Sequence, residues 1–460
     1  MMELPRRWTA RGIAHAAGRA ALPALLVPAL LAAACTASAR GDVTPAVSGT
    51  DAPGTAAGAA ARGNGVPAPG TVLDSGAARS VQPLPSSSEG TGEGDGSGAG
   101  SVDAGSSVEA SEPLDVRPFT FASRDVHDRP MEVSAAFVTS PDGWTGQGPR
   151  PLLVVAPGTS GMADRCAPSR KAAEGQMTDA AVREFADAGW AVVLTDYQGL
   201  GTPGTHTYMV RAAQGHAVLD AARAGLAFDD AAVPGSPVAI TGYSQGGGAA
   251  AAAAELAPSY APELDLRGVV AGAVPADLAE VAETIDGSVL AGATGYTING
   301  LVAAYPELEP QLDRLMNDRG RAMLETVNDQ CAAETMLMFN GRTTDAYSVD
   351  GRSLTEHLHD NADIRARVDE QRIGRLTPRA PLFMMHNVAD DIVPFAQGRH
   401  LAEEWCSAGA DVRFTTVDQD LGPLMNHGIA QRKTQRAQWE FLRAAVLGDG
   451  PSTPSNCGAF

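Results

Sequence analysis

Positive charge is scarce in this sequence of 460 residues. The 34 Lys and Arg residues stand against 54 Asp and Glu, which gives a formal net charge of -20 at pH 7. Lysine is nearly absent, since Lys171 and Lys433 are the only two. Binding of nucleic acid depends on clustered Lys and Arg that neutralise phosphates. The charge balance therefore excludes nucleic acid as an expected partner.

The sequence also lacks an N-terminal apolar run long enough to span a membrane. The stretch AALPALLVPALLAAAC (20–35) is short and contains two prolines, but it follows four arginines and ends in small residues. These features are typical of an export signal, which we predict over residues 1–35. Its end, LAAAC, resembles the lipobox of bacterial lipoproteins, so Cys35 is the candidate for lipidation and membrane attachment. Ordinary cleavage that frees a soluble product is the alternative.

Apolar periodicity is missing from residues 36–112. This stretch consists mainly of Ala, Gly, Ser, Pro and Thr with scattered acidic residues. Such a composition cannot bury enough apolar surface to offset the entropy of ordering the chain. We therefore predict a disordered tether over 36–112 and a globular domain over 113–460.

Beyond residue 113, continuous apolar runs alternate with helical patterns. The runs are PLLVVAPG (151–158), AVVLTDY (191–197), PVAITGYS (237–244) and APLFMMHNVAD (380–390). Runs of this kind are expected for strands buried on both faces. Helical patterns over 177–190 and 208–228 separate the first three, and residues 266–278 and 410–419 are expected to add two strands. The order predicts an α/β fold with a mainly parallel sheet and helices on both faces.

The segment TGYSQGG contains G-x-S-x-G at a predicted junction of strand and helix. This is the nucleophile elbow of α/β-hydrolases, in which a sharp turn exposes the serine, here Ser244. Gly242 and Gly246 are required because the helix must pass close to the strand. Since glycine is abundant in this chain, the location of the motif carries more weight than the motif itself.

A nucleophilic serine needs a base, and the base needs an orienting carboxylate. In α/β-hydrolases the chain order is Ser, then Asp or Glu, then His. Asp390, at the end of a predicted strand, is the expected acid, and its neighbour Asp391 is the alternative. His427 follows the last predicted strand and is the expected base, because His400 comes too soon after the acid.

The remaining polar candidates are backbone groups and other histidines. The oxyanion of acyl transfer needs N–H donors. We expect one from Gln245 and the other from Thr159 or Ser160 in the loop after the first run. His206, His216 and His386 are interpreted as packed or exposed residues without a catalytic role. His357, His359 and Asp360 are too contiguous to predict a metal site, so no metal and no other cofactor is expected.

Several linked motifs resemble the secretory lipase family typified by Candida-type lipases, which has bacterial relatives. The motifs are GTSGMADRCAPS (158–169), LTDYQGLGTP (194–203), HAVLDAARA (216–224) and GYSQGGGAA (242–250) followed by ELAPSYAPEL (255–264). The resemblance covers residues from about 113 to the C-terminus. It implies an α/β-hydrolase that cleaves acylglycerols and simpler carboxylic esters without a cofactor, with Ser244, Asp390 and His427 as its triad. It places the oxyanion donor on Ser160, whereas the general hydrolase rule favours Thr159.

The family also implies a helical cap, which we predict over about 278–378. This insertion is far longer than a usual connection. Several of its apolar residues are candidates for lining an acyl site, although helical apolar stripes more often pack against the body of a protein: Leu301, Tyr305, Leu308, Met336, Leu337 and Phe339.

Four cysteines remain if Cys35 is set aside, an even number that fits an oxidising compartment. Three pairings are possible. The family pattern suggests Cys166 with Cys331 and Cys406 with Cys457.

These observations predict an exported serine lipase or carboxylesterase that acts on ester or lipid substrates. One alternative is another serine acyl enzyme, either a peptidase or an envelope acyltransferase. A second alternative is a surface lipoprotein that binds lipid without catalysis. The sequence does not predict an oligomeric state.

Overall fold

The computed structural model describes residues 66–82, 112–177, 179–228, 232–448 and 454–460. The predicted export signal, Cys35 and the predicted tether over 36–65 and 83–111 lie outside the described residues. Within these ranges, no helix is both long and apolar enough to cross a membrane.

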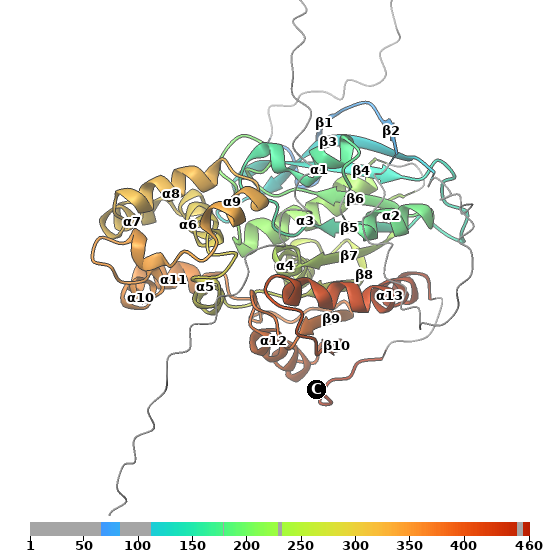
Figure 1. Ribbon diagram of the computed structural model, residues 1–460. Helices are drawn as coiled ribbons and strands as arrows, with labels where there is room; N and C mark the ends of the chain where they lie inside the picture. Colours follow the sequence, from blue (N-terminus) through green and yellow to red (C-terminus); the bar gives the residue numbers. More distant parts are fainter. Residues whose placement is uncertain (1–65, 83–111, 178, 229–231, 449–453) are drawn as a thin grey trace, which may run out of the picture. The chain divides into compact units, whose positions relative to one another are not determined.

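The described residues form a ten-stranded sheet in the order β1-β3-β4-β6-β5-β7-β8-β9-β10, with β2 paired to β3 (Figure 1). Strands β5 to β10 run parallel to their neighbours within that group, whereas β1 to β4 pair in antiparallel fashion. The strands are β1 Val72–Ser75, β2 Arg79–Val81, β3 Leu114–Arg124, β4 Pro130–Thr139, β5 Leu152–Ala156, β6 Ala191–Thr195, β7 Pro237–Tyr243, β8 Asp265–Gly272, β9 Leu382–Asn387 and β10 Val412–Val417.

Each of the six stretches predicted as a strand contains one, from β5 to β10. All residues of β5, β6, β7 and β9 are buried, which explains their continuous apolar sequences. Parallel strands covered by helices on both faces require this pattern. The prediction of a mainly parallel α/β sheet is confirmed.

The prediction of a tether was wrong for residues 72–81. Strands β1 and β2 pair with β3 there, so the sheet begins before residue 113. Most side chains of β1 and β2 are exposed. The two strands are therefore held by backbone hydrogen bonds to β3, and a search for apolar periodicity cannot detect them.

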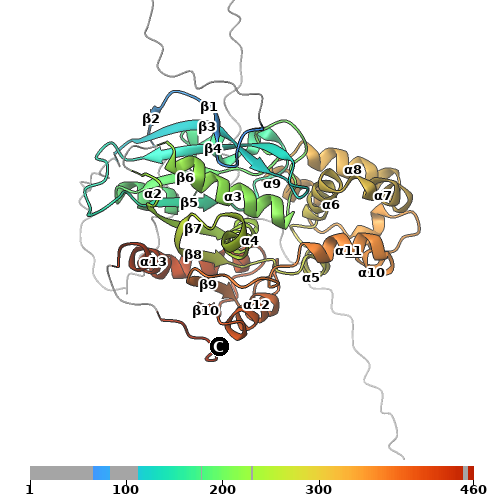
Figure 2. The same cartoon turned by 180° about the vertical axis from the view of Figure 1, so that it is seen from behind.

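Helices cover both faces of the sheet (Figures 1 and 2). One face packs against α3 Arg211–Leu226, α4 Gln245–Tyr260 and α12 Phe395–Ser407. The other packs against α1 Pro168–Ala173, α2 Ala180–Asp187 and α13 Met425–Leu447. The predicted helices over 177–190 and 208–228 correspond to α2 and α3.

The predicted cap region lies between β8 and β9 and has an apolar core of its own. Its helices gather beside the sheet, away from β1 and β2 (Figure 1). They are α5 Leu278–Ile285, α6 Ala293–Ala304, α7 Glu309–Leu315, α8 Asp318–Asn328, α9 Ala332–Phe339, α10 Leu354–Asp360 and α11 Ala362–Glu370.

A buried carboxylate fastens the returning end of the cap to the body of the domain. The Glu255 side chain, on α4, is fully buried and accepts a hydrogen bond of 3.0 Å from Nε of Arg211. It also accepts one of 2.7 Å from the backbone N–H of Gly374 and a longer one of 3.4 Å from Nε1 of Trp405. The Glu255 carboxylate therefore links α3, α4, α12 and the segment after α11.

A second buried carboxylate, Asp196, lies just beyond β6. It accepts hydrogen bonds from Oγ of Ser134 at 2.7 Å and from the backbone N–H of Ser169 at 3.0 Å. Burial raises the pKa of Asp196 to about 7, although hydrogen bonds from Ser169 and Ser134 oppose the shift. The carboxylate thereby joins α1 to the sheet.

Substitution of Glu255 by Gln should strongly destabilise the domain. It leaves the Arg211 guanidinium buried without its counter-charge, which typically costs about 3–5 kcal/mol. Glu403→Gln on α12 is the matched control, because that half-exposed carboxylate pairs with Arg399 at the surface and should contribute about 1 kcal/mol or less. Urea unfolding of both variants measures the difference, and equal losses would contradict the role assigned to Glu255.

The free energy of unfolding should fall as the pH rises from about 4 to about 7, because of Asp196. The raised pKa means that the folded state holds a proton that the unfolded state has released, so rising pH favours unfolding across this window. Asp196→Asn should remove a pH-dependent change on the order of 4 kcal/mol. Urea unfolding at several pH values tests this, with Asp187→Asn on the exposed side of α2 as a control that should keep the wild-type slope.

Candidate active site

Ser244 occupies a sharp turn between β7 and α4. Its backbone has φ 59° and ψ -121°, a conformation that non-glycine residues rarely adopt. A Cβ on Gly242 would collide with the carbonyl oxygen of Gly246, and a Cβ on Gly246 would collide with that of Ala156. The two glycines of the motif are therefore required by the close passage of α4 past β5 and β7.

The structure brings Ser244, His427 and Asp390 together in one chain of hydrogen bonds. Nε2 of His427 lies 2.8 Å from Oγ of Ser244. Nδ1 of His427 lies 2.9 Å from Oδ2 of Asp390. The histidine belongs to the first turn of α13, and the carboxylate follows β9 and is fully buried. Three segments far apart in the sequence thus meet beyond the carboxyl ends of parallel strands.

The alternatives to Asp390 and His427 lie elsewhere. Asp391 accepts a hydrogen bond of 2.7 Å from the backbone N–H of Leu424 and so holds the loop before His427 rather than its ring. His400, on α12, lies in a small polar cavity with Asp277 and Glu280.

A second histidine, His386, contacts Asp390, although the sequence predicted only a packed or exposed residue there. His386 is buried in β9, and its Nε2 lies 2.9 Å from the carbonyl oxygen of Val393 and 3.3 Å from Oδ2 of Asp390. Burial alone would raise the pKa of Asp390, but hydrogen bonds from His386 and His427 hold it below its usual range. The position of His386, four residues before Asp390, was visible in the sequence, but the sequence did not show where the imidazole ring points.

Three backbone N–H groups at the site have no hydrogen-bond acceptor among the described residues: those of Thr159, Ser160 and Gln245. The two loop residues differ in what else they contact. Oγ1 of Thr159 lies 2.7 Å from the hydroxyl of Tyr208, which lines the cavity beside Ser244. The carbonyl of Ser160 accepts a hydrogen bond of 2.9 Å from the N–H of Ala332 in the cap.

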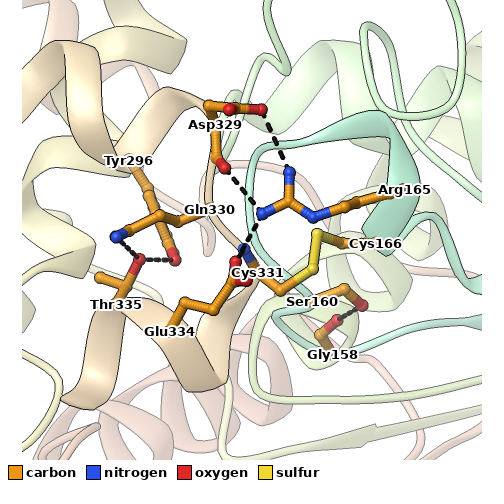
Figure 3. Close-up of a disulfide and its surroundings, with 10 residues drawn as sticks. All are labelled: Gly158, Ser160, Arg165, Cys166, Tyr296, Asp329, Gln330, Cys331, Glu334 and Thr335. Carbon is orange, nitrogen blue, oxygen red and sulfur yellow. Dashed lines mark hydrogen bonds and ion pairs between the residues drawn. A yellow bond between two sulfur atoms is a disulfide. The ribbon is translucent and has the colours of Figure 1, made fainter. Parts of the chain in front are cut away.

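The loop that carries Thr159 is fastened to the cap (Figure 3). Cys166 forms a disulfide with Cys331, and Gly161 pairs with Cys331 in a short antiparallel bridge. Arg165 forms ion pairs with Asp329 and Glu334 on the cap side, at 3.1 and 2.7 Å. A second disulfide joins Cys406 to Cys457. Both cysteine pairings implied by the family resemblance are therefore confirmed.

An apolar cavity, partly open to solvent, leads from Ser244 and Gln245 into the cap. Its walls come mainly from α5, α6, α7 and α10. Of the six cap residues considered as acyl-site candidates, Leu301 and Leu308 line it. The other four lie elsewhere, and Leu337 is 70% exposed.

No group of three or more His, Cys, Asp or Glu side chains is placed to hold a metal ion in the described part of the chain. His357 pairs with Asp350, and His359 pairs with Glu283, each at 2.9 Å.

Known proteins are similar to this chain in sequence and in fold. The family model described as secretory lipase matches residues 168–427, more than half of the chain, a range that includes Ser244, Asp390 and His427. A secreted triacylglycerol lipase of Malassezia furfur is 29% identical over 238 residues, which are 51% of this chain and 47% of that protein. A Mycobacterium tuberculosis protein named as a probable inactive lipase is 29% identical over 276 residues, 57% of this chain and 60% of that one. The chain thus spans about half the length of the Malassezia relative that it matches.

Two solved structures are similar in fold at low identity. Candida antarctica lipase A in its closed state is 19% identical, with a TM-score of 0.64 and coverage of 84% of each chain. The rice cell wall degrading esterase LipA from Xanthomonas oryzae is 20% identical, with a TM-score of 0.64 and coverage of 83% of this chain and 99% of that one. These likenesses show the α/β-hydrolase fold. The match of the family model over residues 168–427 shows that the chain belongs to the secretory lipase family.

Proposed function

We propose that this protein is an exported serine hydrolase that cleaves carboxylic esters with apolar acyl groups through an acyl-serine intermediate. One observation carries the proposal: Ser244, which is hydrogen-bonded to His427 and through it to Asp390, lines an apolar cavity. A serine activated by a histidine and a buried carboxylate is equipped for acyl transfer. A cavity lined mainly by Leu, Ile, Val and Ala side chains suits a hydrocarbon chain.

In the proposed reaction, Oγ of Ser244 attacks the ester carbonyl while Nε2 of His427 takes its proton. Asp390 accepts a hydrogen bond from Nδ1–H, which holds the imidazole tautomer and stabilises the imidazolium. His427 then gives the proton to the leaving alcohol. Water attacks the acyl-serine with the same base, releases the acid and restores Ser244.

The negative charge on the carbonyl oxygen requires preorganised N–H donors. We assign one to Gln245, the first residue of α4, where the helix dipole adds positive potential. We assign the other to Thr159 rather than Ser160. Thr159 contacts cavity-lining Tyr208, whereas Ser160 is hydrogen-bonded toward the cap through its carbonyl group.

Acylglycerols are the proposed class of substrate. The cavity walls are largely aliphatic, and the matched Malassezia protein is named a triacylglycerol lipase. Another relative is named as a probable inactive lipase, so membership of the family does not by itself imply activity. The intact hydrogen-bond chain at Ser244 supports catalysis over the alternative of a lipid-binding protein that lacks it.

We further propose that the exported protein is anchored through a lipid on Cys35. The small residues that lead into this cysteine support the proposal.

The purified full-length protein should hydrolyse p-nitrophenyl esters, and Ser244→Ala should lower kcat at least about 10³-fold, because removal of a triad nucleophile leaves only residual catalysis. A series from short to long acyl chains should show a preference for chains long enough to enter the cavity. Ser236→Ala, a buried serine remote from the cavity lining, is the control and should keep the activity.

A fluorophosphonate should label the wild type and leave Ser244→Ala unlabelled. If the folded wild type is neither labelled nor active, the binding-protein alternative replaces the proposal. If it is labelled but transfers acyl groups mainly to an added alcohol or cleaves amides instead, it is a different serine acyl enzyme.

Anchoring through Cys35 predicts that the wild type is recovered with membranes and incorporates a labelled fatty acid in a bacterial host that carries the lipoprotein pathway. Cys35→Ser should appear in the soluble fraction without the label. Wild type that is soluble and unlabelled would show that the signal is cleaved in the ordinary way.

A further inference from the structure

Residues 206–209, between β6 and α3, form a tight buried turn beside the candidate active site. His206 and Tyr208 are 0% and 5% exposed, and the N–H of Tyr208 donates to the carbonyl of His206 at 2.8 Å. Met209 follows with φ 62°, a left-handed conformation that costs free energy for a residue with a side chain. The sequence predicted no function for this turn, although Tyr208 and Met209 line the cavity next to Ser244.

His206 reaches the residue that follows the nucleophile. Its Nδ1 lies 3.1 Å from the carbonyl oxygen of Gln198, which can only accept, so Nδ1 carries the proton. Nε2 is then an acceptor and receives a hydrogen bond of 3.0 Å from the side-chain amide of Gln245. Burial lowers the pKa of His206 to about 4, so the ring stays neutral near pH 7 and this arrangement persists.

Tyr208 contacts Thr159, the other proposed oxyanion donor. Its hydroxyl lies 2.7 Å from Oγ1 of Thr159, and burial raises its pKa to about 12, so the hydroxyl keeps its proton. Its ring packs edge-on against His206 and Tyr296. A Cβ on Gly300 would collide with the Tyr208 backbone, so α6 holds the turn from the cap side.

We propose that His206 and Tyr208 are positioning residues that fix the separation of the two halves of the oxyanion site. One holds Gln245 and the other holds Thr159, and only one residue stands between them in the sequence. The inference rests on the proposed function and adds a role for residues outside the triad. Donors separated by 86 positions in the chain need such a rigid link, because oxyanion stabilisation is lost when donors move by a fraction of an ångström.

Loss of this link should act on the transition state more than on the bound ester. Hydrogen bonds to the oxyanion strengthen as charge develops, so imprecise donors lower kcat while KM changes little. The proton transfer between Ser244 and His427 does not involve the turn, so the pH profile should keep its shape.

Tyr208→Phe is the central variant, and Tyr296→Phe is its matched control. Both lose one buried hydroxyl, but Tyr296 donates to Oγ1 of Thr335 within the cap, whereas Oγ1 of Thr159 is hydrogen-bonded to Tyr208. We expect Tyr208→Phe to lower kcat about tenfold with KM within about twofold, and Tyr296→Phe to stay within about twofold of wild type in both. Inhibition by a trifluoromethyl ketone, which forms an oxyanion on Ser244, should weaken in Tyr208→Phe by the same factor as kcat/KM.

Thr159→Val removes the same hydrogen bond from its other partner. It should reproduce the loss of Tyr208→Phe, and the double variant should be little worse than either single one, because they share one interaction. For the second contact, His206→Leu should lower kcat, and His206→Gln, which keeps an acceptor for the Gln245 amide, should recover part of it. Thermal unfolding identifies any variant that fails to fold.

The inference is overturned if Tyr208→Phe matches Tyr296→Phe in kcat. It is also overturned if the variants lose kcat with an altered pH profile and unchanged ketone affinity, since that assigns the loss to the triad. These results differ from failure of the proposed function, in which the wild type itself hydrolyses no ester and reacts with no fluorophosphonate.

Discussion

The close passage of α4 past the ends of β5 and β7 is the contact on which the rest of the site depends. No side chain fits at Gly242 or Gly246, and this allows the turn that gives Ser244 its left-handed backbone. The same contact places the N-terminus of α4 beside the serine, together with the N–H of Gln245, which has no acceptor in the part of the chain that the structure describes. The six consecutive alanines that follow are almost fully buried, so α4 can pack closely against both the sheet and α3. Small residues thus fix the position of Ser244, and the backbone strain at this residue is offset by the dense packing of α4.

Hydrogen bonds to a buried carboxylate and a disulfide attach the cap and the Thr159 loop to the rest of the domain. Glu255 joins the returning end of the cap to α3, α4 and α12, and the disulfide between Cys166 and Cys331 joins the cap to the Thr159 loop. The two attachments lie at different points of the insertion, so the cavity walls and the candidate triad belong to one connected structure. Asp196 extends this support by joining α1 to the sheet behind that loop.

The strands of the parallel half of the sheet could be predicted from the sequence alone, because strands buried on both faces have continuous apolar sequences. It failed for β1 and β2, whose exposed residues are stabilised by pairing with β3 and carry no pattern of their own. The chain order of Ser244, Asp390 and His427 was also readable, since it follows from the order of the strands. The contacts of His386, His206 and Tyr208 were not, because each depends on a partner brought close only by folding. Thr159 and Ser160 could not be separated for the same reason, since adjacent residues differ only in the neighbours that they meet.

The cap is inserted between β8 and β9, which are hydrogen-bonded neighbours in the sheet. The chain leaves the sheet and returns to the adjacent position, so the insertion can change in length or sequence without altering the strand order. Most of the cavity wall is encoded by this one stretch, whereas Ser244, Asp390 and His427 are encoded outside it. The cavity lining can therefore change by substitutions within the insertion while Ser244, Asp390 and His427, which lie outside it, stay the same.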